Sequence, residues 1–218
     1  VGKDALLEAI DRLPPARRRL RLVVTVGRLH PVKGIGRLVH AWISDERLRA
    51  TTNLVVIGGD LAAPTPGERM VLADIERITS SHGHTDGLIL LGHRAHDEVA
   101  RALSFAAGRS PSSPPCGIYV GGAAKEEFGL AIVEALAAGL PVVAPDAGGP
   151  PTYVEHGASG VLVDTTDPVA LAAAMHAALA MADAEGRADR VSASILARFT
   201  IDRTADGLLD LYRRTTTA

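Results

Sequence analysis

Two glutamates stand eight residues apart in the segment KEEFGLAIVEALAAGLPVVAPDAGG, residues 125–149. Glu126 comes just before an almost wholly apolar stretch, and Glu134 interrupts that stretch. A carboxylate that is buried without a partner costs several kcal/mol, so Glu134 needs hydrogen-bond donors from the protein or from a ligand. Two adjacent hydroxyls, such as a ribose diol, would match its two oxygens. The alternative interpretation is that Glu134 caps a loop amide and that Glu126 is solvated beside Lys125.

The residues between the two acids supply free backbone amides. Phe128, Gly129 and Leu130 open a predicted helix over residues 129–138, and the first N–H groups of a helix have no partner within it. Such groups bind anions or sugar hydroxyls, and Gly129 lets a ligand approach the backbone closely. Apolar side chains surround most of this helix, so we expect it to be largely buried.

A second set of candidate side chains follows the first predicted strand, in VGRLHPVKGIG. Arg28 and Lys33 lie in this turn, ahead of a predicted helix. Arg can bind two phosphate oxygens at once and Lys acts as a mobile point charge, so the two cations suit a diphosphate. A solvated basic loop is the alternative. We reject a dinucleotide fingerprint in GIGRLV because Val39 stands where its third glycine belongs.

Six short apolar runs, rich in β-branched residues, predict the strands that would position these residues. They cover residues 21–27, 53–59, 88–92, 117–122, 140–145 and 160–164. Helical patterns follow at 36–44, 67–81, 97–107 and 129–138, then a short helix at 151–156 and helices from Pro168, from about Ala188 and near the C-terminus. Nearly continuous apolar strands are typical of a parallel sheet that is covered on both faces. We therefore expect an α/β fold, a doubly wound Rossmann-like parallel sheet that binds ligands at the carboxyl ends of its strands.

The composition narrows the class of partner. A net charge of −2 gives no electrostatic case for nucleic acid or an anionic membrane, and an aromatic share of 3% argues against stacking on single-stranded nucleic acid. No apolar run approaches the roughly 18 residues of a membrane span, and the first residues show no signal peptide. The single cysteine, Cys116, excludes an internal disulfide and fits a reducing compartment, so we expect a cytoplasmic protein. The missing initiator methionine suggests a fragment or a processed chain.

Histidine pairs raise the alternative of a metal site. His82 and His84 are separated by one residue, and His93 and His96 by two, which are plausible ligand spacings. No cysteine or carboxylate pattern completes either set, so we favour solvated loop histidines and expect no metal.

Four ordered motifs resemble a known family. EEFGLAIVE resembles the E-x7-E signature of retaining nucleotide-sugar glycosyltransferases with the GT-B architecture, family four. GRLHPVKG, GLPVVAPDAGGPPTYVEHGASGVLVD and FTIDRTADGLLDLYRR match the same family in the same order. The strings GGP at 148–150 and GGD at 58–60, with the extended region 65–82, are most similar to the sucrose synthase and sucrose-phosphate synthase branch. Glu127 departs from the family, which commonly has proline or another small residue there.

The resemblance implies a division of the chain and a role for it. It covers only the C-terminal, donor-binding half of such enzymes: residues 1–20 would be a linker remnant with an N-terminal helix, 21–199 the nucleotide-sugar domain, and 200–218 a C-terminal crossover helix. The acceptor domain would be absent, and the chain alone would be inactive. The final helix would then expose its apolar side, with Leu208, Leu209, Leu211 and Tyr212.

The resemblance also implies roles for individual residues. The whole enzyme would transfer a sugar, with retention, from a nucleotide-diphosphate sugar such as a UDP-sugar, without metal or cofactor. Arg28 and Lys33 would bind the diphosphate, Glu126 the sugar hydroxyls and Glu134 the ribose. The remaining donor contacts would come from Phe128, Gly129, Leu130, Arg94 beside the base, and the loop of Gly148 and Gly149. A nucleotide-binding module without catalysis and a sugar-nucleotide epimerase of the same architecture are the alternatives.

Overall fold

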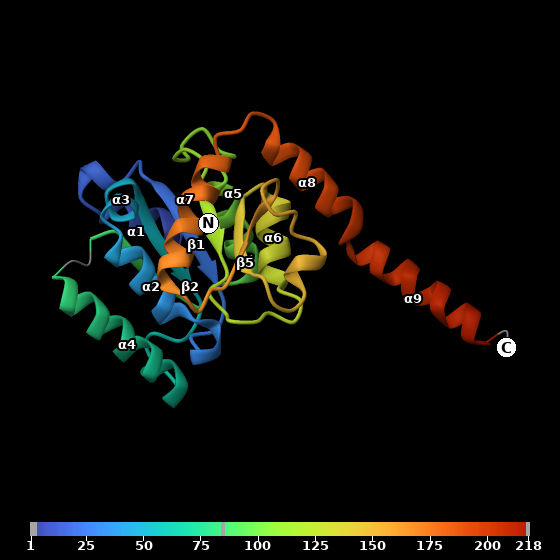
Figure 1. The fold of residues 1–218 in the computed structure, drawn as a ribbon, viewed down its shortest axis with the longest axis horizontal. Helices are drawn as coiled ribbons and strands as arrows, with labels where there is room; N and C mark the ends of the chain where they lie inside the picture. The colour runs from blue at the N-terminus through green and yellow to red at the C-terminus, as the bar shows by residue number, and fades with distance from the viewer. Residues whose placement is uncertain (1–3, 84–85, 217–218) are drawn as a thin grey trace.

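A parallel sheet forms the centre of the molecule in the computed structural model, which describes residues 4–83 and 86–216. Its six strands lie in the order β3-β2-β1-β4-β5-β6, and every neighbouring pair is parallel (Figure 1). The strands are β1 (Arg21–Val26), β2 (Thr52–Ile57), β3 (Leu88–Gly92), β4 (Ile118–Val120), β5 (Val142–Pro145) and β6 (Gly160–Val163). The predicted doubly wound α/β fold is therefore confirmed, and its strand order reverses direction between β1 and β4.

Helices cover both faces of the sheet. The α-helices of the described residues are α1 (Ala5–Asp11), α2 (Ile35–Ser44), α3 (Glu46–Thr51), α4 (Pro66–His82), α5 (His96–Ala106), α6 (Leu130–Ala138), α7 (Pro168–Met181), α8 (Arg187–Arg198) and α9 (Ile201–Thr216). Short 3-10 turns occur at η1 (Pro15–Arg17), η2 (Pro31–Lys33) and η3 (Pro150–Thr152). In β1, Leu22 and Val24 pack with α1, α5, α6 and α8, whereas Val23 packs with α2, α3, α4 and α7. Alternate residues of one strand thus pack into two separate hydrophobic cores, one on each face of the sheet.

One local prediction was wrong, and one helix was missed. The short helix predicted at 151–156 is only the turn η3, because the backbone leaves the helical region at Tyr153, where φ is −140°. The helix α3 was not predicted, since its sequence ERLRAT contains one apolar core residue, Leu48. Asp45 caps α3 by accepting the Leu48 N–H at 2.8 Å, and its second carboxylate oxygen lies 2.9 Å from Nε2 of His176 in α7. Good helix formers and a local N-cap therefore form α3, although six residues are too few to show a helical period in the sequence.

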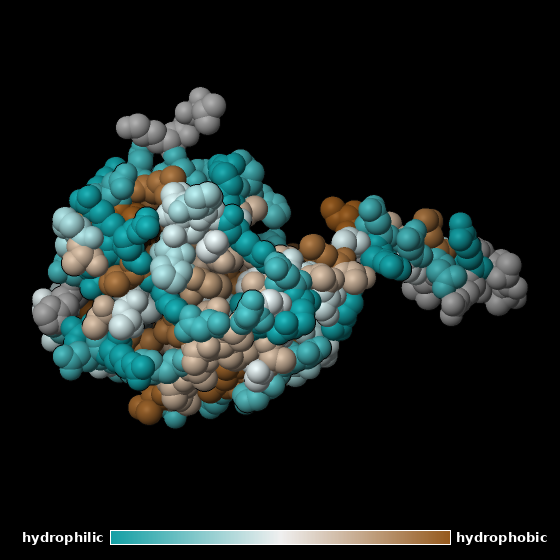
Figure 2. Space-filling model, turned by 90° about the horizontal axis from the view of Figure 1, so that it is seen from above, coloured by the Kyte–Doolittle hydropathy of each residue, from teal (hydrophilic) through white to brown (hydrophobic). Residues whose placement is uncertain are grey.

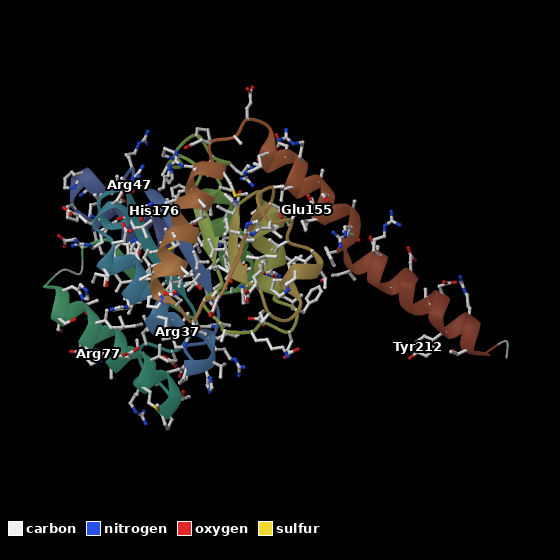
Figure 3. The ribbon with its side chains drawn as sticks, viewed as in Figure 1. Arg37, Arg47, Arg77, Glu155, His176 and Tyr212 are labelled. Carbon is white, nitrogen blue, oxygen red and sulfur yellow. The ribbon has the colours of Figure 1, made fainter. Side chains whose placement is uncertain are left out.

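The two ends of the chain differ in how they join this body. Near the N-terminus, Leu6 and Ile10 of α1 are buried in the core. Near the C-terminus, α9 extends away from the body as an arm, with Tyr212 towards its far end (Figures 1, 2 and 3). Ile201, Leu209 and Tyr212 on that arm are 88%, 52% and 68% exposed. The side chains of Leu208 and Leu211, also predicted for this apolar side, lie outside the described ones. Within the described residues, no helix combines the length and apolarity needed to cross a membrane.

Candidate active site

A cavity of about 500 Å³ opens where the strand order reverses, at the carboxyl ends of β1 and β4. Parallel α/β sheets commonly bind ligands at this position. Seven of the predicted site residues line the cavity together: Arg28, Lys33, Glu126, Phe128, Gly129, Leu130 and Glu134. Residues more than 100 positions apart in the chain thus meet at one edge of the sheet, as the motif spacing predicted.

The two cations occupy one side of the cavity. Arg28 follows β1 and is exposed, and it forms no ion pair with any residue that the structure describes. Lys33 ends η2, and its Nζ lies 2.7 Å from Oε2 of Glu126. The Lys33 and Glu126 side chains are 29% and 22% exposed, so this ion pair is partly shielded from water. The alternative in which Glu126 is merely solvated beside Lys125 does not describe this geometry.

The N-terminus of α6 points its first amides at the same cavity. Gly129 is the N-cap, with φ +83° in the left-handed region, and no described side chain caps the helix. Its carbonyl already accepts the N–H groups of Ile132 and Val133. Leu130 and Ala131, whose amides precede those, both line the cavity. The positive end of a helix dipole therefore lies beside Arg28, an arrangement that suits a bound anion.

Glu134 lies one turn further along α6 and faces the cavity. Its side chain is 38% exposed, and Leu130 is 69% exposed, so the prediction that α6 is largely buried is wrong for this face. The helix packs on the sheet with Ile132, Val133 and Leu136, while the opposite side opens on the cavity. Among the described residues, Glu134 accepts no hydrogen bond from a loop amide, and Nε2 of the His96 ring lies 3.8 Å from its Oε1. The carboxylate is thus available to a ligand.

Gly148 and Gly149 support the site from behind instead of lining the cavity. The Glu126 N–H donates to the Ala147 carbonyl at 3.4 Å, and the Gly149 N–H donates to the Glu126 carbonyl at 2.8 Å. A Cβ on Gly148 would lie 2.1 Å from the Glu126 carbonyl oxygen. These glycines therefore let two backbone segments touch and fix the 126–129 loop. Their expected place near a donor stays a prediction, since in this structure they contact the backbone of a loop that lines the cavity.

Two other predicted positions have clear locations. Glu127 is 84% exposed and pairs with Lys125 at 2.8 Å, so the unusual carboxylate is neutralised in solvent. Arg94 does not line the main cavity but a neighbouring one of about 710 Å³, which shares Arg28 with it. Its guanidinium donates to the Leu91 carbonyl, and its Nε is buried with no hydrogen-bond partner among the described residues. A ligand that spans both cavities would pass Arg28.

Two tyrosines that the sequence analysis did not single out support the site. Tyr153 donates its hydroxyl hydrogen to the Phe128 carbonyl, and Tyr119 lines the cavity and donates to the Val26 carbonyl at 3.3 Å. Burial raises the pKa of both hydroxyls well above the usual value, so both remain donors at neutral pH. Their signal in the sequence was weak, since an isolated tyrosine is also a common core residue.

The histidines do not assemble into a metal site in the described part of the chain. His82 ends α4 and leads into the start of β3, whereas His93 and His96 follow the end of that strand. A five-residue strand is about 17 Å long, so His82 lies near one end of β3, and His93 and His96 lie near the other. The structure describes residues 4–83 and 86–216, and in these no three His, Cys, Asp or Glu side chains cluster as metal ligands. His84 lies outside those ranges.

Comparisons with known proteins identify the family. The family model "Glycosyl transferases group 1" matches residues 6–193. A sucrose synthase from Acidithiobacillus caldus is 29% identical over 208 residues, which are 90% of this chain and 25% of the relative. A D-inositol 3-phosphate glycosyltransferase from Acidothermus cellulolyticus is 34% identical over 211 residues, 91% of this chain and 43% of the relative. The chain thus spans less than half the length of these relatives.

Solved structures show the same fold. A sucrose-phosphate synthase from Thermosynechococcus elongatus superposes with a TM-score of 0.77 and 27% identity, over 99% of this chain and 51% of that one. The Anabaena protein HepE, solved in complex with UDP and glucose, has a TM-score of 0.72 and 23% identity, over 97% and 55%. The motifs, the sheet order and these matches agree with the GT-B glycosyltransferase resemblance. This chain belongs to the group 1 glycosyl transferases, as one half-sized domain of the GT-B architecture.

Proposed function

We propose that this chain is the donor-binding domain of a retaining glycosyltransferase that uses a nucleotide-diphosphate sugar. The observation that carries the proposal is the joint lining of one cavity by two cations, an open helix N-terminus and the Glu134 carboxylate. A diphosphate would lie against Arg28, Lys33 and the amides of Leu130 and Ala131. The ribose would reach Glu134, and the base would extend past Arg28 towards Arg94.

The proposed chemistry is mainly electrostatic. In a retaining transfer, the bond from the anomeric carbon to the diphosphate breaks, and the acceptor's hydroxyl oxygen forms a bond to that carbon on the same face. The leaving phosphate accepts the proton of that hydroxyl. Negative charge grows on the diphosphate as that bond breaks. Arg28, Lys33 and the α6 amides would stabilise this charge, and preorganised donors of this kind commonly supply the largest part of a rate enhancement. Glu126 would hold the sugar hydroxyls next to Lys33. This scheme calls on no metal or cofactor.

A UDP-sugar is the first donor to test. The HepE structures contain UDP, UDP with glucose, or UDP-glucose, and the pneumococcal O-GlcNAc transferase GtfA contains UDP and GlcNAc. Because this chain spans about half of such structures, we propose that an acceptor-binding domain completes the enzyme and that this chain alone binds donor without transfer. The cytoplasmic location expected from the single cysteine stays a prediction.

Calorimetry tests this proposal directly. We expect one of UDP-, GDP- and ADP-glucose to bind the chain, and Arg28→Ala to weaken that binding about tenfold or more, because a charged phosphate contact is lost. Arg77→Ala on the far side of α4 is a matched control and should leave the affinity unchanged. Absence of binding by all three sugars would refute the proposal. Binding followed by release of an epimerised nucleotide sugar, with no glycosylated product in the longer protein, would favour the epimerase alternative.

A further inference from the structure

Three aromatic rings meet behind the 126–129 loop. Phe128 and Tyr153 have ring centroids 5.6 Å apart, and Phe199 lies 5.8 Å from each of them. The chain has only three phenylalanines and three tyrosines, so half of these six residues gather at this one place. Tilted and edge-to-face pairs at such distances attract one another beyond their burial.

Each ring comes from a different element. Phe128 belongs to the 126–129 loop and lines the cavity, and Tyr153 is the C-cap of η3. Phe199 is the C-cap of α8, two positions before α9 begins. Arg198 strengthens this junction, because its guanidinium lies 5.0 Å from the Phe199 ring centroid and donates to the Thr152 carbonyl at 3.3 Å. The end of α8 is therefore joined to η3 and to the 126–129 loop.

Phe128 links this cluster to the proposed donor contacts. The Glu126 carboxylate lies two residues before it, and the open amides of α6 begin two residues after it. The Tyr153 hydroxyl donates to the Phe128 carbonyl and, at 3.5 Å, reaches the Gly129 carbonyl. A rotation of the Phe128 backbone would move the carboxylate and the amides together. The aromatic cluster is placed to prevent that rotation.

We infer that Phe199 is a positioning residue for the 126–129 loop, which couples the joint between α8 and α9 to binding of the diphosphate and sugar. This inference rests on the proposed function, because it assigns the loop to those parts of the donor. Phe199 does not line the cavity, so it acts through Phe128. The α9 arm departs from this joint, and its direction therefore bears on the loop (Figure 1).

Binding of two ligands distinguishes a positioning role of Phe199 from a general destabilisation of the fold by its substitution. UDP-glucose should contact the 126–129 loop, whereas uridine should reach only Glu134 and the neighbouring cavity. We expect Phe199→Ala to weaken UDP-glucose binding about fivefold to tenfold, since two ring contacts are lost, while uridine affinity measured by NMR titration stays within about twofold. Phe199→Tyr keeps the ring and should restore the affinity. Leu196→Ala, at a 51% exposed apolar position of α8, is the control and should match the wild type.

Other results of these titrations would overturn the positioning role of Phe199. Equal weakening of UDP-glucose and uridine by Phe199→Ala, or wild-type affinity for both, would overturn the inference while leaving the proposed function intact. If Phe199→Ala does not fold, Tyr153→Phe keeps that ring and removes the hydroxyl that donates to the Phe128 carbonyl and reaches the Gly129 carbonyl. It should weaken UDP-glucose binding about threefold and spare uridine, given the usual worth of one neutral hydrogen bond. If GDP- or ADP-glucose proves to be the donor, that sugar nucleotide and its nucleoside replace UDP-glucose and uridine in this comparison. A wild-type chain that binds none of the three sugar nucleotides would remove the proposed function and this inference with it.

Discussion

A diphosphate that enters the cavity competes with Glu126 for the charge of Lys33. In the structure Lys33 and Glu126 pair with each other at 2.7 Å, so the charge of Lys33 is already partly used. A phosphate must share Lys33 with the Glu126 carboxylate, which also repels it. The sugar, in contrast, offers hydroxyl donors to that carboxylate. The two residues should therefore respond differently to the phosphate and sugar parts of the donor.

Replacement of Glu126 by glutamine tests this division. We expect Glu126→Gln to leave UDP affinity unchanged or slightly higher, because Lys33 is released to the phosphates. UDP-glucose affinity should fall roughly tenfold to a hundredfold, as a hydrogen bond to a charged group contributes about 1.5–3 kcal/mol. Calorimetry with both ligands measures the difference. Glu127→Gln is the matched control, since that acid pairs with Lys125 in solvent. Equal weakening of UDP and UDP-glucose by Glu126→Gln would contradict the assignment.

At the scale of elements, the 126–129 loop depends on a close backbone approach. Gly148 has φ +96°, and a Cβ there would lie 2.1 Å from the Glu126 carbonyl oxygen. Gly157 also has a positive φ, +82°, but a Cβ there would meet nothing within 4 Å. Alanine would be strained at both positions, but only at Gly148 would its methyl group also collide with a neighbouring backbone segment. The two positions therefore form a matched pair for substitution.

Alanine substitutions at Gly148 and Gly157 separate the cost of backbone strain from the cost of a steric collision. We expect Gly157→Ala to lower the free energy of unfolding by about 1 kcal/mol, the usual cost of a left-handed residue. Gly148→Ala should cost at least about 1 kcal/mol more and weaken UDP-glucose binding several-fold, because the loop must move away from the new methyl group. Urea denaturation and calorimetry measure both effects. Equal stability and affinity of the two variants would show that the contact with Glu126 is unimportant.

The sequence predicted the elements better than their faces. Strand bounds agreed within two residues, because continuous apolar runs such as the one that contains Val23 and Val24 are distinctive of a doubly covered sheet. The predicted burial of the helix around Glu134 was wrong for the face that carries this residue, since the burial of a helix face depends on where the neighbouring strands end. The contact of Gly148 with the Glu126 backbone likewise depends on two distant segments of the chain. The motifs brought seven site residues to one cavity, but their supports were visible only in three dimensions.

At the scale of the whole molecule, α8 and α9 differ in their attachment. Ile195 of α8 is 3% exposed and belongs to the core, whereas Leu209 of α9 is 52% exposed on the arm. The arm is visible in the space-filling view as a projection with both apolar and hydrophilic side chains (Figure 2). Burial stabilises a fold only where side chains leave water, so α9 should contribute little to the stability of this domain.

Two truncations of aliphatic side chains test that difference. We expect Ile195→Ala to lower the free energy of unfolding by about 2–4 kcal/mol, because it opens a cavity in the core. Leu209→Ala should change it by less than about 0.5 kcal/mol, as is usual for an exposed position. Chemical denaturation of the chain measures both values. A large loss of stability with Leu209→Ala would show that the arm packs on the body in solution.

The central claim is that Glu134 binds the ribose diol of the donor, in the same cavity where Arg28 and Lys33 bind the diphosphate. A comparison of UDP with 2′-deoxy-UDP tests this claim most directly. Wild-type protein should prefer UDP by about tenfold, since the hydrogen bond from the 2′-hydroxyl to a carboxylate is lost in the deoxy ligand. In Glu134→Ala the two ligands should bind equally, both with the weaker affinity. A preference for UDP that survives this substitution unchanged would contradict the account.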